Sequence, residues 1–95
     1  MSRRALTERE IVEALAGVPA WSRVGDTIRR AVTFATFAEG IRFVDRVAVE
    51  ADARDHHPDI DIRYTTVTLA LSTHSAGGLT RLDFDLAERI DRLAG

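Results

Sequence analysis

The chain has 95 residues, a length typical of one domain with one hydrophobic core, so we expect residues 1–95 to form a single domain. Hydrophobic residues make up 45% and charged residues 29% of the chain, which excludes an intrinsically disordered protein. The formal net charge of −2 excludes a strongly basic surface over the whole molecule, so no direct nucleic-acid partner is predicted.

The sequence contains no cysteine, which excludes disulfides, thiolate nucleophiles and cysteine-ligated metal sites. The first residues carry charge, but no apolar signal region follows them, and no run of eighteen apolar residues occurs. We therefore expect a cytoplasmic protein with no membrane partner.

The first third of the chain predicts a short helix and a β-hairpin. Thr7 stands three residues before Glu10, which is the spacing of a capping box, so a helix should begin there. Residues 21–24 and 27–34 flank a Gly-Asp turn and predict two antiparallel strands. Arg30 falls on the same face of the second strand as the apolar residues predicted to face the core.

The middle of the chain predicts a long helix followed by a polar loop. Apolar residues recur at helical spacing over residues 37–53. Pro58 lacks an amide hydrogen and restricts the residue before it, so the helix should not continue through residues 55–59. This loop contains His56 and His57.

The last third predicts one strand and a final helix. Residues 64–73 are β-branched and alternate between polar and apolar positions, which indicates a strand with one buried face. Thr80 precedes Asp83 by three residues and predicts the start of an amphipathic helix.

These elements together predict an α+β fold in which helices cover one face of a sheet. Three strands are visible in the pattern, and residues 60–62 could add a fourth. So small a sheet leaves open edges, which favour association with further copies of the chain.

The candidate chemistry lies with three histidines in the second half of the chain. His56 and His57 are adjacent in the polar loop, and His74 follows the predicted strand. Such segments can meet at one end of a sheet, where Asp83 could join them. Histidine exchanges protons near neutral pH, so this pattern indicates acid–base catalysis.

Each candidate residue also has an ordinary structural role. A histidine in a polar loop is most often simply solvated. Asp83 fits a capping carboxylate in the first helical turn, and Asp52 fits an exposed helix residue one turn before the loop. Trp21 fits the core or an interface better than a ligand platform. Both kinds of role stay open at this point.

Two other classes of site are less well supported. His56, His57 and His74 could ligate zinc together with Asp52 or Asp83, but adjacent histidines usually point apart and the sequence has no His-x-x-x-His pair. Serines next to His74 are not set in a nucleophile elbow, so a serine hydrolase is also disfavoured.

A longer motif resembles the signature of the pterin-4a-carbinolamine dehydratases. It consists of Asp52, His56-His57-Pro58, Tyr64, His74 and Asp83 at fixed spacings. Residues 71–80, which read Leu-Ser-Thr-His-Ser-Ala-Gly-Gly-Leu-Thr, are similar to that family as well. The similarity extends over the chain from about Glu8 onward.

This resemblance implies a four-stranded antiparallel sheet with three helices packed on one face, assembled into homodimers or homotetramers. It also implies a hydro-lyase, a 4a-hydroxytetrahydrobiopterin dehydratase. Such an enzyme converts the pterin substrate 4a-hydroxytetrahydropterin into quinonoid dihydropterin and so recycles the cofactor of aromatic amino-acid hydroxylases. The resemblance implies no metal and no organic cofactor.

By the same resemblance, His56 and His74 are the expected acid–base pair, and His57 is a pterin-binding or proton-sharing partner. Asp83 is expected to orient a histidine, and Asp52 to hold the loop or contact the pterin.

Trp21, which precedes the hairpin as in the family, is a further expected substrate-binding residue. Two positions depart from the family pattern, because Ile60 stands where an aromatic residue is common and Leu82 where a basic one is common. Either change could alter the affinity for pterin. The alternative function is a non-catalytic module of the same fold, since some animal members act as dimerisation cofactors of a homeodomain transcription factor.

Overall fold

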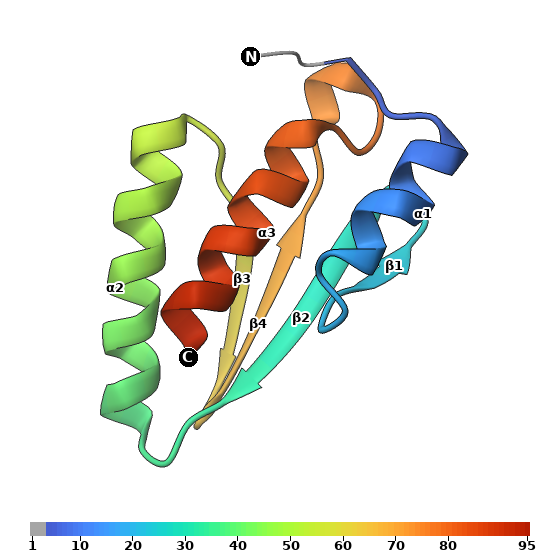
Figure 1. Ribbon diagram of the computed structural model, residues 1–95. Helices are drawn as coiled ribbons and strands as arrows, with labels where there is room; N and C mark the ends of the chain where they lie inside the picture. The colour runs from blue at the N-terminus through green and yellow to red at the C-terminus, as the bar shows by residue number, and fades with distance from the viewer. Residues whose placement is uncertain (1–3) are drawn as a thin grey trace.

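The computed structural model describes residues 4–95, which form three α-helices, four strands and one short 3₁₀ turn (Figure 1). The predicted domain also includes residues 1–3, which lie outside the described part. In chain order the elements are α1 (Glu8–Ala16), β1 (Ser22–Val24), β2 (Thr27–Thr33), α2 (Phe37–Arg54), β3 (Asp59–Arg63), β4 (Thr66–Leu71), η1 (His74–Ala76) and α3 (Arg81–Ala94).

The capping box predicted at Thr7 and the helix cap predicted at Thr80 are both confirmed. The Glu10 amide donates to the Thr7 hydroxyl over 3.2 Å, and the Thr7 amide donates to the Glu10 carboxylate over 2.9 Å. Thr80 and Asp83 make the same reciprocal pair at the start of α3. Each box satisfies amide donors that have no partner inside the helix.

The four strands form one antiparallel sheet in the order β1-β2-β4-β3, and the helices lie in front of this sheet in the view of Figure 1. The predicted fold class, a four-stranded antiparallel sheet with three helices on one face, is therefore confirmed. Strands β2 and β4 are neighbours although α2 and β3 separate them in sequence. The edges of the sheet are β1 and β3.

The strand predicted over residues 64–73 is too long at both ends, because β4 spans only Thr66–Leu71. Residues 59–63 form β3, which pairs with β4, and β4 begins only at Thr66. Tyr64 has a φ of 51° and takes the left-handed conformation in the turn between the two strands. Tyrosine is common in strands, so the sequence pattern places Tyr64 in one. The tight turn instead requires the left-handed backbone conformation at this residue.

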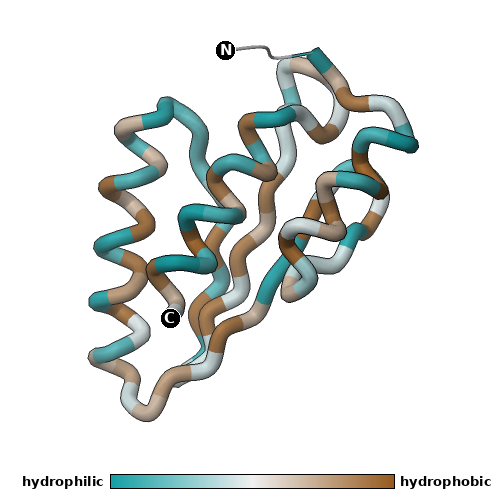
Figure 2. Tube along the Cα trace, viewed as in Figure 1, coloured by the Kyte–Doolittle hydropathy of each residue, from teal (hydrophilic) through white to brown (hydrophobic). Residues whose placement is uncertain are grey.

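The core lies between the helices and the sheet. Val67, Leu69 and Leu71 are fully buried and alternate with partly exposed residues, as the strand pattern predicted. Figure 2 shows hydrophobic and hydrophilic residues alternating along α2 and α3, as expected for helices with one apolar face. Within residues 4–95, no helix is both long enough and apolar enough to cross a membrane.

Arg30 faces the helices because it has an acidic partner there. Its guanidinium pairs with Asp91 on α3, and the indole nitrogen of Trp21 donates to the same carboxylate oxygen over 2.8 Å. A charged residue on the inner face is tolerated when it is paired and hydrogen-bonded. This contact ties the hairpin to the last turns of α3.

Candidate active site

The end of α2 sets the positions of His56 and His57. Asp55 terminates the helix in the left-handed conformation, with a φ of 48° and a ψ of 43°. The amide of His56 then donates back to the Ala51 carbonyl over 3.1 Å. As a result His56 turns inward and is 7% exposed, whereas the side chain of His57 is 55% exposed.

His56 makes a buried pair with Asp83. The Nε2 atom of His56 lies 2.6 Å from Oδ1 of Asp83, and Asp83 is completely buried. The other oxygen, Oδ2, accepts hydrogen bonds from the Thr73 hydroxyl over 2.8 Å and from the Thr80 amide over 2.9 Å. Three hydrogen-bonding groups and the first turn of α3 therefore converge on this one carboxylate.

His57 makes a second, exposed pair. Its Nε2 lies 2.9 Å from Oδ1 of Asp52, which belongs to the last turns of α2. The Asp52 side chain is mostly exposed, so water screens this pair, and it contributes little to folding stability. The two adjacent histidines therefore occupy very different environments.

His74 begins the η1 turn and lies at the same end of the molecule. Figure 1 shows the loop after α2, the η1 turn and the start of α3 together at this end. The Oγ of Ser72 lies 3.3 Å from Nε2 of His74. Thr73, the residue before His74, bonds to Asp83, so the two segments that carry His74 and His56 meet at one carboxylate.

A small cavity adjoins His74. Its volume is about 190 Å³, and its lining comprises Asp26, Thr27, Ser72, Thr73, His74, Gly77 and Gly78. The β1–β2 turn thus contributes polar groups beside this histidine. No sequence signal had linked that turn to the histidines, because the contact depends on the pairing of β2 with β4.

The structure does not bring Trp21 to this end. Trp21 is 4% exposed, and its indole bonds to Asp91 of α3. Asp91 lies eight residues beyond Asp83 on the same helix, a distance of about 12 Å along the helix axis at 1.5 Å per residue. The other five candidate residues belong to the segments that meet at the end of the molecule where the three histidines lie, which we call the histidine end. These residues are Asp52, His56, His57, His74 and Asp83.

Thr73 and Thr80 also belong to the site, because both bond to Asp83, and the sequence analysis did not predict this role. Thr80 was recognised only as a helix cap, and Thr73 only as part of a longer similarity. The capping-box spacing already placed the Thr80 backbone beside Asp83, so that contact could have been found. The Thr73 contact is long-range in the fold and carries no local signal.

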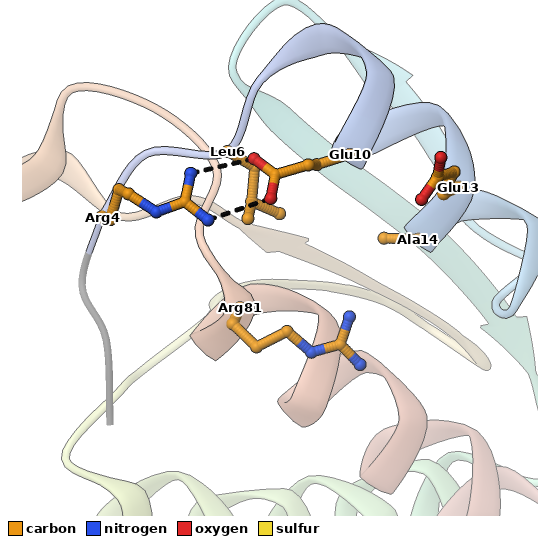
Figure 3. A pocket seen from close by; sticks show the side chains of 6 residues that line it. All are labelled: Arg4, Leu6, Glu10, Glu13, Ala14 and Arg81. Atoms are coloured by element: carbon orange, nitrogen blue, oxygen red, sulfur yellow. Dashed lines mark hydrogen bonds and ion pairs between the residues drawn. The ribbon is translucent and has the colours of Figure 1, made fainter.

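A larger cavity, of about 420 Å³, is lined by different residues, which are Arg4, Leu6, Glu10, Glu13, Ala14 and Arg81 (Figure 3). Figure 3 shows Arg4 and Glu10 facing each other through two contacts, each of 2.9 Å. The hydrogen bond from Arg4, with that from the Thr7 amide, lowers the pKa of Glu10 to about 2. This cavity holds no histidine, so it is a poorer candidate for proton exchange near neutral pH.

No group of three or more histidine, aspartate or glutamate side chains within residues 4–95 is arranged to hold a metal ion. The zinc alternative required three histidines to converge with a carboxylate. Instead, His56 and His57 each bond a different aspartate.

The chain is similar to many proteins of one family. The sequence profile of the family "Pterin 4 alpha carbinolamine dehydratase" matches residues 4–93. A protein of Mycobacteroides abscessus named "Putative pterin-4-alpha-carbinolamine dehydratase" is 58% identical over 90 residues, which cover 95% of this chain and 96% of that protein. A Nocardia farcinica protein of the same name is 53% identical over 94 residues, which cover 99% of each chain.

Solved structures show the same fold. A Brucella melitensis protein described as a transcriptional coactivator/pterin dehydratase superposes with a TM-score of 0.93 at 35% identity, covering 97% of this chain and all of that one. A pterin dehydratase-like protein described as a RuBisCO assembly factor in the alpha-carboxysome superposes with a TM-score of 0.65 at 24% identity, covering 79% of this chain and 87% of that one. The second similarity concerns the fold alone.

Proposed function

Because the chain belongs to the pterin-4a-carbinolamine dehydratase family, we propose that it removes water from a 4a-hydroxytetrahydropterin and releases quinonoid dihydropterin. The relatives are named as dehydratases, which are hydro-lyases. The observation that carries the proposal for this chain is the buried His56–Asp83 pair, 2.6 Å apart, at the end of the sheet that also holds His57 and His74.

The reaction needs two proton transfers. The bond between C4a and its hydroxyl oxygen breaks, and that oxygen takes a proton from a general acid to leave as water. The neighbouring ring nitrogen gives its proton to a general base, and the electron pair forms the new carbon–nitrogen double bond. Groups that exchange protons near pH 7 suit both steps, and histidine is the side chain with that property.

Asp83 determines which nitrogen of His56 can serve the substrate. An ionised carboxylate only accepts hydrogen bonds, so Nε2 of His56 must carry the proton that points to Asp83. Within residues 4–95, Nδ1 of His56 makes no hydrogen bond, so this nitrogen can contact the substrate. We assign Nδ1 as the atom that exchanges a proton with the substrate.

His74 is the second proposed acid–base group, and His57 with Asp52 is the proposed binding pair. Both histidines are exposed at the histidine end, where a flat pterin ring can approach them. Trp21 is buried beside the last turns of α3, away from this end, so its proposed influence on substrate binding acts through the support of the hairpin. Recycling of the pterin for an aromatic amino-acid hydroxylase is the proposed physiological setting.

Replacing either proposed acid–base histidine tests the function. We expect His56→Ala and His74→Ala each to lower kcat for carbinolamine dehydration by at least about a hundredfold, the usual contribution of a positioned general acid or base. The measurement is a stopped-flow dehydration assay on purified protein, with circular dichroism to verify folding. Asp61→Ala on β3, an exposed residue paired with Arg63, is the control and should retain activity. Full activity in both histidine variants would rule out this site.

A second function is favoured by the description of the Brucella melitensis protein, which names a transcriptional coactivator beside the dehydratase. The alternative is therefore a non-catalytic binding module of the same fold. It would be preferred if wild-type protein failed to dehydrate any reduced pterin and instead formed a defined complex with a transcription factor.

A further inference from the structure

A chain of buried hydroxyl groups stands behind the His56–Asp83 pair. The Thr73 hydroxyl lies 2.8 Å from Oδ2 of Asp83 and also 2.8 Å from the Thr80 hydroxyl. Thr73 is 3% exposed, Thr80 is completely buried, and so is Asp83. Polar groups at this depth need defined partners, because an unpaired one costs free energy.

The direction of each hydrogen bond in this chain follows from the number of donors. A threonine hydroxyl has one proton, and that of Thr73 is donated to the carboxylate of Asp83. The contact between the two hydroxyls must then be a donation from Thr80 to Thr73. The Thr80 oxygen in turn accepts from the Leu82 amide over 3.2 Å. Every proton in the chain thus points toward Asp83.

Thr73 also fixes the segment that carries His74. Its amide and carbonyl form an isolated antiparallel bridge with Gly78, with nitrogen–oxygen distances of 3.3 and 3.4 Å. Its carbonyl accepts from the Ala76 amide over 3.0 Å within the η1 turn. One residue therefore contacts both the carboxylate that orients His56 and the turn that begins with His74.

We propose that Thr73 is a positioning residue, whose hydroxyl holds Asp83, and through Asp83 His56, in a fixed arrangement relative to His74. The proposal rests on the proposed function, since it assigns Thr73 to the support of that same acid–base pair. The Thr80 hydroxyl completes the arrangement by donating a hydrogen bond to the Thr73 oxygen.

Removal of the Thr73 hydroxyl leaves the carboxylate with one donor fewer while the shape of the side chain is retained. Valine has the same branched outline as threonine, so Thr73→Val keeps the packing and deletes one hydrogen bond to Asp83 and one from Thr80. The Asp83 carboxylate then shifts toward its remaining donors, and the ring of His56 follows it. Displacements of about 1 Å at a catalytic group can cost about a hundredfold in rate.

The experiment compares Thr73→Val with Thr73→Ser, which restores the hydroxyl. We expect Thr73→Val to lower kcat by about tenfold to a hundredfold with little change in KM, and Thr73→Ser to stay close to wild type. Thr66→Val is the matched control, because it removes a hydroxyl that contacts another threonine, Thr33, at the opposite end of β4. It should retain wild-type kcat.

A second readout does not depend on activity. Nitrogen-15 NMR of the histidine rings reports which nitrogen carries the proton, and we expect wild-type His56 to be protonated on Nε2. In Thr73→Val the His56 ring shifts should change, and in Thr73→Ser they should not. Wild-type His56 protonated on Nδ1 alone would overturn the proposal even if Thr73→Val did not fold.

The outcomes separate this inference from the proposed function. An unchanged kcat in Thr73→Val, an equal loss in Thr73→Ser, or a loss of kcat with unchanged His56 shifts would overturn the positioning role. Wild-type protein without dehydratase activity would overturn the proposed function instead, and the NMR comparison would still decide whether Thr73 orients His56.

Discussion

Asp83 serves two purposes at the residue scale. Its backbone and carboxylate complete the capping box of α3, and the same carboxylate accepts from His56 and Thr73. The sequence is compatible with either a capping role or a site role, and one carboxylate with two oxygens accommodates both. Because Asp83 is completely buried, each donor that faces its carboxylate must form a hydrogen bond with it.

Asp83→Asn is expected to lower activity strongly while the fold is kept. An amide has one acceptor oxygen and one donor group, so it can match either His56 or the two donors at Oδ2, but not both. If the amide nitrogen faces His56, that ring must adopt the other tautomer, a change that costs up to about 10⁴-fold in a related histidine–aspartate arrangement. Steady-state kinetics give the measurement.

Asp85→Asn is the matched control for this prediction. It removes the same charge two residues further along α3, where the partly exposed Asp85 pairs with Arg81. Wild-type activity is expected there. Equal losses in the two variants would mean that the overall charge of α3, and not the bond to His56, is responsible.

At the element scale, the segment before α1 is held by the carboxylate of Glu10. Arg4 donates to both of its oxygens, and Thr7 donates its amide to one of them. These bonds lower the pKa of Glu10 to about 2. Arg23 similarly lowers the pKa of Glu8 through a hydrogen bond between the hairpin and α1.

Acid is therefore expected to weaken this end of the molecule. A carboxylate whose pKa is lower in the folded than in the unfolded state stabilises the fold fully above the unfolded value, and that contribution is lost as pH falls through the folded value. For Glu10 the window runs from the model-compound value of 4.5 down to about 2. Glu10→Gln should flatten the decline of Tm across this window, as measured by calorimetry.

Glu13→Gln is the comparison for that titration. Glu13 lies about one turn after Glu10 on α1 and forms an exposed ion pair with Arg9, so this variant removes the same charge. We expect its decline of Tm to follow wild type more closely than that of Glu10→Gln. Identical slopes for wild type and Glu10→Gln would contradict the assigned role of the Arg4–Glu10 contact.

At the scale of the whole molecule, β3 is one of the two edges of the sheet and is exposed along its whole length. All five of its residues are exposed, including Ile60 and Ile62, which lie on the side of the sheet that faces the helices. An unpaired edge with apolar side chains favours pairing with another strand. We propose that a second copy of the chain covers this edge in a homodimer or homotetramer.

The assembly prediction is tested by mass in solution. Multi-angle light scattering should give a multiple of the 10.5 kDa chain mass. The double variant Ile60→Lys with Ile62→Lys should lower that mass, since charge on an edge strand opposes pairing. Val12→Lys on α1, which is also exposed, should leave it unchanged. A wild-type monomer at micromolar concentration would contradict the proposal.

Local signals sufficed for much of the fold and failed where contacts are long-range. The capping boxes and the alternation of Val67, Leu69 and Leu71 depend on neighbours in sequence, and both were predicted. Residues 60–62 were a possible fourth strand, but the boundary with β4 was misplaced because Tyr64 has a strand-forming side chain and a left-handed backbone. The sequence pattern gives no reason for Arg30 on the inner face, because its partner Asp91 lies 61 residues away.

The sequence by itself determined the chemical groups available, namely three histidines and two nearby aspartates at spacings typical of one family, and the helices and strands that carry them. Only the tertiary structure decided how these groups differ. The left-handed turn at Asp55 sends His56 into the interior and leaves His57 at the surface. The bonds of Thr73 and His56 to Asp83 join residues 10 and 27 positions away from it. Such contacts exist only after β4, η1 and α3 have packed together, so no pattern of neighbouring residues encodes them.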